Sequence, residues 1–329
     1  MTGRGVARHR VGLAVGAALA ALVVAGTVTA LRPAAAGAPA GRQRPGVTMA
    51  TPTATPTTTS TTAPTGAAAS PGAPSPAAAP ASVAVLSADA PPAATLAAAR
   101  ARARSETGLT PPPFASLPLP GYAKEPPAAA SVAPVRGPLA VSPAPGAAPV
   151  RRLTDPTDKG APLHLLVLGR AADATGAAWT KVALEERPNG TVGWVRGSDV
   201  VETPDPWRVT LLQSRHRLLV WYGHSLVADE PAAVGAPATP TPVHLTYVDV
   251  LVDTGNPAGA YGRWILGLAS HSEVYDTFGG GDALIALHGT DDAASVGHSV
   301  SHGCVRLPNA FAVTLAHLLP LGTRVDLQR

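Results

Sequence analysis

The feature that most limits what this chain can fold into is a long stretch rich in small residues and proline, residues 33–150. Of its 118 positions, 91 are Pro, Ala, Thr, Gly or Ser, and it holds 24 of the chain's 36 prolines. This composition offers too little apolar surface to offset the entropy lost when a chain becomes ordered. We therefore predict a disordered Pro/Ala/Thr-rich linker over residues 33–150. The folded part is then expected within residues 151–329, which carry all five tryptophans.

The net charge of +4 conceals opposite charges in the two parts of the chain. Residues 1–150 carry 11 Lys and Arg against 3 Asp and Glu, whereas residues 151–329 carry 14 against 18. A nucleic-acid partner requires a basic face on the folded domain, so we expect no nucleic acid. The chain has one cysteine, Cys304. An intrachain disulfide is therefore excluded, and stability must come from packing.

Residues 1–32 have the pattern of an export segment. Arg4, Arg8 and Arg10 precede an uncharged run of 21 residues, 11–31. A secretory signal core has about 7–15 residues and a membrane-spanning helix about 20, and small residues after the run offer cleavage sites. We expect residues 1–32 to be a signal peptide or an N-terminal membrane anchor. Either way, the rest of the chain is expected to be exported. As a retained anchor, residues 11–31 would tether it to the cytoplasmic membrane.

Short apolar runs broken by turn residues predict a small all-β module over residues 160–204. Pro188-Asn189-Gly190 separates two of these runs, and Asn-Gly is a strong hairpin signal. The stretch from Trp179 to Val195 resembles the bacterial SH3-like β modules, small β-barrels. We expect its Trp and Val side chains to lie in the core of the module.

Residues 207–329 predict a second, mainly β unit. The run at 243–252 alternates apolar and polar residues, as a half-buried strand does. One helix is expected after Pro308 and Asn309, where apolar residues follow at helical spacing until Pro320 and Gly322 stop it.

The stretch 286–309 gathers the groups that acyl transfer by a thiol requires. A cysteine attacks as its thiolate, and a nearby histidine accepts and returns the proton. Backbone N–H groups stabilise the oxyanion, a glycine lets the substrate approach closely, and a cation holds a substrate carboxylate. All these residue types occur here within 19 positions, at His288, Ser301, His302, Gly303, Cys304 and Arg306.

His-Gly-Thr at residues 288–290, followed by Ser-His-Gly-Cys-Val-Arg-Leu at 301–307, resembles the signature of the L,D-transpeptidase (YkuD) catalytic domain family, peptidoglycan cross-linking enzymes. The resemblance covers residues 207–329 and includes Thr-Pro-Thr-Pro at 239–242. Val243 departs from the glycine usual in the family. The implied fold class is mainly β, a YkuD-type β-sandwich with one helix after the catalytic loop, preceded by the SH3-like module.

The resemblance also implies roles for individual residues. Cys304 is the expected nucleophile and His288 its base. The backbone amides of Gly303 and Cys304 are expected near the oxyanion, with Ser301 and His302 polarising the site. Substrate binding is expected from Arg306, Gly289 and Tyr261.

The resemblance implies a reaction on peptidoglycan stem peptides. Family members attack the carbonyl of the third stem residue and release the terminal D-alanine. An amine of a neighbouring stem then takes the acyl group, which gives a 3→3 cross-link. The resemblance implies that neither a metal nor an organic cofactor is needed. It also implies that carbapenem β-lactams are inhibitors and that the protein is located in the cell wall or on the periplasmic side. We expect a monomer.

Other functions compete with this prediction. The same site with water as acceptor gives an L,D-carboxypeptidase, and a decayed site gives a non-catalytic peptidoglycan-binding protein. A papain-like protease would place its cysteine before its histidine, and the His and Cys spacings match no common zinc pattern. We expect His271 and His298 to be loop or surface residues, and Asp291-Asp292 to be a solvated turn.

Overall fold

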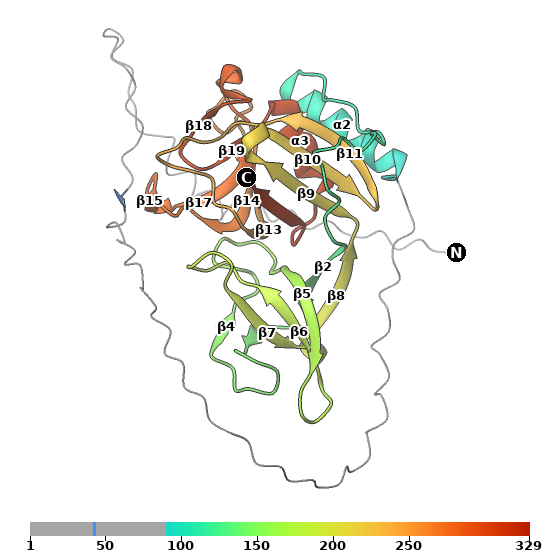
Figure 1. Ribbon diagram of the computed structural model, residues 1–329, viewed down its shortest axis with the longest axis vertical. Helices are drawn as coiled ribbons and strands as arrows, with labels where there is room; N and C mark the ends of the chain where they lie inside the picture. Colours follow the sequence, from blue (N-terminus) through green and yellow to red (C-terminus); the bar gives the residue numbers. More distant parts are fainter. Residues whose placement is uncertain (1–41, 44–89) are drawn as a thin grey trace, which may run out of the picture.

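The computed structural model of the chain describes residues 42–43 and 90–329 (Figure 1). The predicted export segment and most of the predicted linker lie outside these residues. Within the described residues the fold is mainly β, as predicted, with two α-helices, α2 (Ala93–Thr107) and α3 (Asn309–Leu318). None of the described helices is long and apolar enough to cross a membrane.

Eight strands between residues 207 and 328 form one sheet, in the order β11-β10-β9-β20-β13-β14-β17-β19. Neighbours run antiparallel, apart from the parallel pairs β9–β20 and β17–β19. The strands are β9 (Trp207–Leu212), β10 (Arg217–Tyr222), β11 (Ser225–Pro231), β13 (Leu245–Asp253), β14 (Trp264–His271), β17 (Leu284–His288), β19 (Val305–Arg306) and β20 (Arg324–Gln328). We call residues 206–329 the carboxy-terminal unit.

The single sheet differs from the predicted β-sandwich, and the cause is β13. Its first residues, Leu245–Tyr247, pair with β20, whereas its later residues, Val248–Asp253, pair with β14. The pairing with β14 is irregular between Val248 and Val250, and such irregularities bend a strand. One long strand thus joins the two halves of the sheet, which curls instead of splitting in two.

Helix α3 lies where the sequence predicts a helix. Phe311, Leu315 and neighbouring apolar residues are fully buried in the core of the sheet, as a helix that is apolar around most of its surface should be. Pro308 precedes the first turn, and the helix ends before Pro320, which cannot continue it.

Residues 129–205 form a smaller β unit, which we call the amino-terminal unit. Its five strands lie in the order β7-β6-β5-β2-β8, all antiparallel. They are β2 (Ala129–Pro134), β5 (Leu165–Ala172), β6 (Ala178–Ala183), β7 (Val192–Arg196) and β8 (Val200–Asp205). A hairpin of β3 (Leu139–Val141) and β4 (Arg151–Leu153) packs beside them. Trp179, Val182 and Val195 are buried, as predicted, whereas Trp194 is half-buried and Val192 is exposed. The likeness to SH3-like modules stays a prediction.

Several short strands lie beside the main sheet. The strands β12 (Val234–Gly235) and β18 (Ser299–Ser301) form a parallel pair, and β15 (Tyr275–Phe278) and β16 (Gly281–Asp282) form a hairpin. The outer edge of β15 pairs with β1 (Arg42–Gln43).

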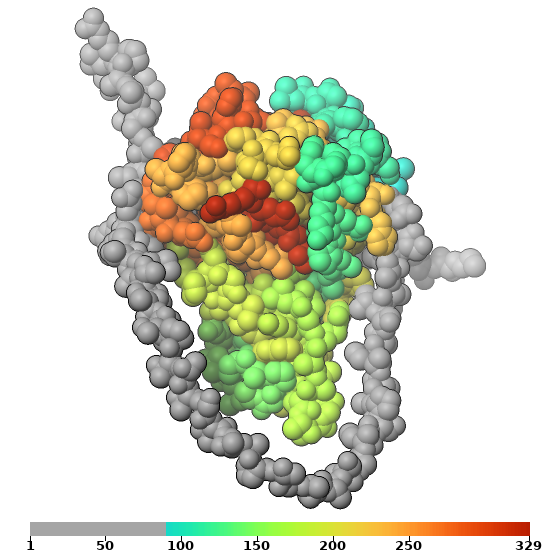
Figure 2. Space-filling view, in the orientation of Figure 1, coloured from blue at the N-terminus to red at the C-terminus, as the bar shows by residue number. Residues whose placement is uncertain are grey.

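The structure corrects the prediction of a linker for residues 90–150. Residues 129–150 supply β2 and β3 to the amino-terminal unit, and we call residues 90–128 the strap. The strap packs along one side of the carboxy-terminal unit (Figure 2). Ala99 and Ala103 of α2 are buried, four residues apart on one helix face. The prediction from composition was wrong because alanine was counted as a linker residue. In the structure, the small alanine side chains let α2 pack closely against α3.

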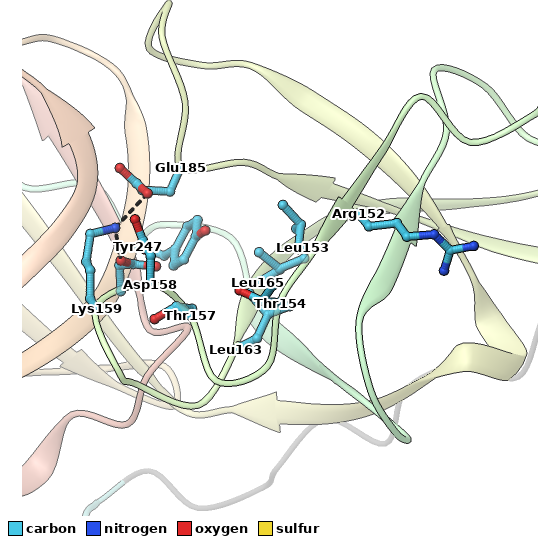
Figure 3. A pocket seen from close by; sticks show the side chains of 11 residues that line it. Arg152, Leu153, Thr154, Thr157, Asp158, Lys159, Leu163, Leu165, Glu185 and Tyr247 are labelled. Atoms are coloured by element: carbon cyan, nitrogen blue, oxygen red, sulfur yellow. Dashed lines mark hydrogen bonds and ion pairs between the residues drawn. The ribbon is translucent and has the colours of Figure 1, made fainter. Parts of the chain in front are cut away.

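Tyr247 and Ala269 of the carboxy-terminal unit belong to the hydrophobic core of the amino-terminal unit, so the two units share a core at their junction. A cavity of about 210 Å³ lies there, lined by residues of both units (Figure 3). Lys159 lines this cavity. Its Nζ donates hydrogen bonds to the carboxylates of Glu185 (2.6 Å) and Asp249 (3.0 Å). None of the predicted site residues lines this cavity.

Candidate active site

The parallel pair β17–β19 brings together three of the predicted site residues. Leu287 pairs with Val305, and His288 with Arg306. Leu287 and Val305 point into the hydrophobic core, so the alternation of side chains along a strand places His288 and Arg306 on the other face. Cys304, two residues before Arg306, comes to the same face.

The hydrogen bond of His288 defines which ring nitrogen can act as a base. The side chain is 3% exposed, and Nδ1 contacts the carbonyl oxygen of Gly289. A carbonyl oxygen can only accept, so Nδ1 carries the proton and Nε2 keeps its lone pair. Burial lowers the pKa of His288 to about 4, and the positive charge of Arg306 adds to this. The imidazole is therefore neutral near pH 7 and able to accept a proton.

The thiol of Cys304 is protonated in the resting site. Burial raises its pKa above the ordinary value, while the backbone of Ala286 and the charge of Arg306 oppose this shift. The residue as a whole is half-buried, and Sγ lies 3.8 Å from the carbonyl oxygen of Leu284. The site thus holds a neutral thiol and a neutral imidazole, so the thiol would have to lose its proton before it could act as a nucleophile.

The loop before Cys304 is held by hydroxyl groups. Ser301 is buried, its Oγ donates to the carbonyl of Cys304 (2.5 Å) and it accepts the N–H of Gly303 (3.1 Å). The N–H of Gly303 therefore has a partner within its own loop in the structure. Its expected place near an oxyanion stays a prediction, as does that of the Cys304 amide.

Thr239 and Thr241 are positioning residues that the sequence analysis missed. Thr239 Oγ1 donates to the carbonyl of Ser301 (2.9 Å), and Thr241 Oγ1 donates to that of Gly303 (2.7 Å). Gly303 has φ +125°, and a Cβ there would lie 3.0 Å from Ile285, so this position requires glycine. The Thr-Pro-Thr-Pro motif was the available signal, because it supplies these two hydroxyl groups.

Asn309, the first residue of α3, connects this helix by hydrogen bonds to the segment after His288 and to the loop after β13. Its Oδ1 accepts the N–H of Thr290 (2.6 Å), and its Nδ2 donates to the carbonyl of Pro257 (3.2 Å). A Cβ on Gly289 would lie 2.2 Å from this Oδ1. Gly289 therefore serves close packing, and its carbonyl orients His288.

Tyr261 and His302 lie near the reacting pair. The ring of Tyr261 meets that of His288 edge to face, with centroids 4.9 Å apart. The pKa of Tyr261 is raised, chiefly by burial and then by Cys304. The ring of His302 contacts Phe278 (5.3 Å) and Tyr275 (6.4 Å) in the β15–β16 hairpin.

Arg306 has a half-buried guanidinium with no acidic partner among the described residues. Its backbone N–H and carbonyl pair with Ala233, which fixes the start of the side chain. A cation held in a site without an internal counter-charge is suited to bind a carboxylate.

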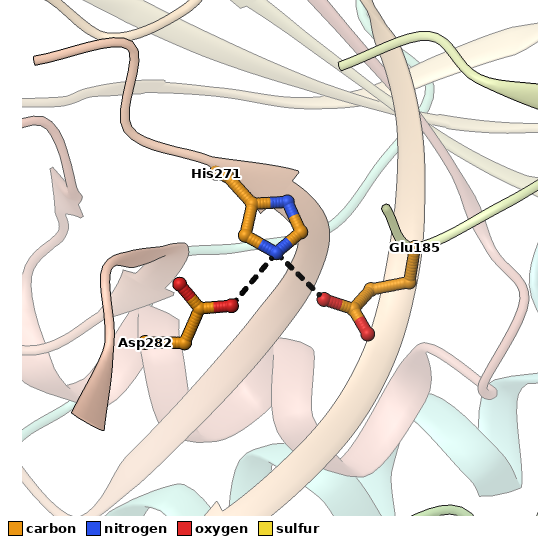
Figure 4. Close-up of side chains that lie close together, drawn as sticks. All are labelled: Glu185, His271 and Asp282. Atoms are coloured by element: carbon orange, nitrogen blue, oxygen red, sulfur yellow. Dashed lines mark ion pairs between the residues drawn. The ribbon is translucent and has the colours of Figure 1, made fainter. Parts of the chain in front are cut away.

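A second cluster of titratable groups lies at the junction of the units, where His271 Nε2 is 3.0 Å from both Glu185 and Asp282 (Figure 4). His271 is 3% exposed, so the prediction of a loop or surface residue is wrong for it; His298 and the Asp291-Asp292 turn are exposed, as expected. One imidazole nitrogen and two carboxylate oxygens, one from each of these residues, are atoms of the type that binds a divalent cation. However, Lys159 and Arg187 already pair with the two carboxylates, so the three residues form part of an ion-pair network.

Comparison with known proteins agrees with this geometry. The family model of the L,D-transpeptidase catalytic domain (YkuD) matches residues 206–327. A Bacillus licheniformis protein named as the L,D-transpeptidase YkuD is 31% identical over 130 residues, which are 39% of this chain and 70% of the relative. The chain belongs to the L,D-transpeptidase (YkuD) family.

A second L,D-transpeptidase relative, named YkuD and from Bacillus subtilis, is 28% identical over 156 residues, 46% of this chain and 87% of the relative. Among solved structures, an L,D-transpeptidase 3 of Mycobacterium tuberculosis with a faropenem-derived adduct is 16% identical, with a TM-score of 0.34, covering 50% of this chain and 91% of that one. The family is an enzyme class, and its homologues are consistent with peptidoglycan cross-linking.

Proposed function

We propose that this chain is a cysteine-dependent L,D-transpeptidase that forms 3→3 cross-links between peptidoglycan stem peptides. The observation that carries the proposal is the state of His288. Its Nδ1 proton is held by the Gly289 carbonyl, so Nε2 is free on the face of the sheet that it shares with Cys304 and Arg306. This is the arrangement a thiol needs in order to lose its proton at the moment of attack.

The first half of the proposed reaction forms a thioester. Nε2 of His288 takes the proton of the Cys304 thiol, and Sγ bonds to the carbonyl carbon of the third stem residue. The Cys304 amide is the proposed donor to the oxyanion. When the intermediate collapses, the C–N bond to the terminal D-alanine breaks, and the imidazolium gives its proton to the leaving amine.

The second half transfers the acyl group to an acceptor. The amine of a neighbouring stem attacks the thioester carbonyl, His288 takes its proton, and the thiolate leaves and is reprotonated. Arg306 is the proposed partner of a stem carboxylate, because no described acidic side chain occupies it. Tyr261, His302 and Gly289 would line or shape the groove beside the reacting atoms.

Residues 1–32 support a proposed location outside the cytoplasm. Their charge pattern and apolar run predict export, and residues 11–31 would keep the protein at the cytoplasmic membrane, within reach of the cell wall.

The test of this function is acylation of the full chain by a carbapenem, followed by intact mass. We expect one adduct on the wild type and none on Cys304→Ala. His288→Ala should lower the acylation rate by at least about 100-fold, which is the usual loss when a general base is removed. The matched control is His298→Ala, which changes an exposed histidine outside the site and should leave the rate unchanged.

Product analysis on a stem tetrapeptide separates the alternatives. A cross-linked dimer with released D-alanine supports the transpeptidase, and free tripeptide alone means an L,D-carboxypeptidase with the same site. An unreactive wild type with a readily alkylated Cys304 would overturn the proposal in favour of a non-catalytic peptidoglycan-binding protein.

A further inference from the structure

The β15–β16 hairpin packs against the loop that precedes Cys304, yet few residue pairs join its two strands. Its rings Tyr275 and Phe278 contact His302, two residues before Cys304. The two strands share only two residue pairs, and neither belongs to the eight-stranded sheet. Glycines at 279 and 280, both with positive φ, form the tip. The position of the hairpin therefore depends on contacts from outside it.

Beside the pairing of β15 with β1, several of those contacts come from the amino-terminal unit, through the turn between β6 and β7. The guanidinium of Arg187 donates to the carbonyl oxygens of Ser272 (2.7 Å) and Tyr275 (3.2 Å). It also reaches the carbonyl of Asp276 (3.4 Å) and the carboxylate of Asp282 (3.1 Å). One planar cation with five N–H donors thus connects both strands of the hairpin and the residue at its base.

Asn189, two residues further along the same turn, fixes the strand that leads into the hairpin. Its Nδ2 donates to the carbonyl of His271 (2.8 Å), and its Oδ1 accepts the N–H of the same residue (2.8 Å). The His271 ring lies 3.0 Å from Asp282, so Asp282 is held from two sides. The hairpin is therefore attached at both ends to one turn of the other unit.

We propose that Arg187 is a positioning residue of the L,D-transpeptidase site: it holds the β15–β16 hairpin against His302, two residues before the proposed nucleophile Cys304. The kinetic part of this inference rests on the proposed function, whereas the structural part does not. The sequence explains why the turn is where it is, because Pro188-Asn189-Gly190 closes the β6–β7 hairpin and presents Arg187 and Asn189 to the neighbouring unit.

The test compares Arg187→Ala with Arg170→Ala in the full chain. Arg170 pairs with Glu202 inside the amino-terminal unit, where both side chains are partly exposed, and it is the matched control for loss of a charge and an ion pair. The first readout is hydrogen exchange of peptides covering residues 272–283. We expect exchange to become about tenfold faster in Arg187→Ala, because local opening costs less once its anchors are gone, and to stay unchanged in Arg170→Ala.

The second readout is the second-order rate of Cys304 acylation by a carbapenem. We expect Arg187→Ala to lower it about tenfold, the order of effect of a misplaced supporting group. The loss should appear at subsaturating carbapenem and be partly rescued by Arg187→Lys, whose single ammonium retains the Asp282 contact but cannot bridge the carbonyls.

The combination of results decides the inference. Faster exchange together with slower acylation supports it. Unchanged exchange in a folded Arg187→Ala overturns it, and so does faster exchange with wild-type acylation, because the hairpin would then not act on the site. If the wild type itself is not acylated, the proposed function has failed, and the exchange result alone decides whether Arg187 holds the hairpin.

Discussion

At the scale of the residue, the site combines a buried base with a buried thiol, and burial acts on the two groups in the same direction. It disfavours both the imidazolium and the thiolate. The resting pair is therefore uncharged over the neutral range, unlike a preformed thiolate–imidazolium pair. The positive charge of Arg306 lowers the pKa of Cys304 and also that of His288. It therefore favours loss of the thiol proton but disfavours the imidazolium that would result.

The lowered pKa of His288 predicts that acylation of Cys304 continues to an unusually low pH. The folded-state pKa of about 4 lies below the ordinary 6.5, so His288 stays neutral as pH falls through 6.5 and is protonated only near 4. We expect the acylation rate of the free protein to be flat between about pH 5 and 8 and to fall with a midpoint near 4. Stopped-flow acylation across pH checks this, with circular dichroism to confirm that the protein stays folded. A midpoint near 6.5 would contradict it.

At the scale of the element, the strap stabilises the carboxy-terminal unit from outside its sheet. Phe114 packs on Phe311 of α3 with ring centroids 5.7 Å apart. Backbone N–H groups of Ala115 and Leu117 donate to β11 (3.1 and 2.8 Å), which covers the edge of the sheet. Glu106 of α2 accepts from Trp264 and His317. The strap thus protects a strand edge that would otherwise be open to pairing with another chain.

Phe114→Ala should destabilise the protein by about 3 kcal/mol, because it removes a buried ring and leaves a cavity. Leu119→Ala is the matched control in the same segment: Leu119 is 58% exposed, and its truncation should cost at most about 0.5 kcal/mol. Urea unfolding measures both. Equal, small effects in the two variants would show that the strap contributes nothing to folding.

The elements differ in how well the sequence predicted them, and the reason is physical. The order of His288, Cys304 and Arg306 along the chain, with the helix after them, follows from local signals, so the placement of α3 was predictable. The strap was not, because its packing depends on where alanines fall on one helix face and not on composition. His271 was wrongly interpreted because its partners, Glu185 and Asp282, are brought to it only by the tertiary fold.

At the scale of the whole molecule, the two units are joined by a buried acid at their boundary. Asp205, the last residue of β8, accepts the N–H of Trp207 (2.9 Å) and the hydroxyl of Thr323 (2.6 Å). Burial raises its pKa to about 6, against the opposing effect of these hydrogen bonds. Because this value lies above the ordinary 3.8, the folded state favours the protonated acid. The stabilisation is present below pH 3.8 and is lost as pH rises through 6.

Asp205→Asn should therefore stabilise the protein at pH 8, by on the order of 1–3 kcal/mol, and by roughly half as much at pH 5, where part of the stabilisation by the protonated acid is still present. The amide keeps an acceptor for Trp207, and Thr323 can turn its hydroxyl to accept from the new donor. Thermal unfolding at the two pH values measures this, with the exposed Asp199→Asn as control. An equal loss of stability at both pH values would mean that the charge itself holds the junction.

The strap also determines how the two units follow one another along the chain. It precedes the amino-terminal unit in sequence but packs on the carboxy-terminal unit, so residues 129–205 are an insertion within one folded body. The insertion is attached at both ends, which lie side by side, because Ala129 pairs with Asp205. The sheet that carries His288 is complete only when β20 lies between β9 and β13, and the core of the inserted unit includes Tyr247 and Ala269. Neither unit can therefore complete its packing before the carboxy-terminal part of the chain is present.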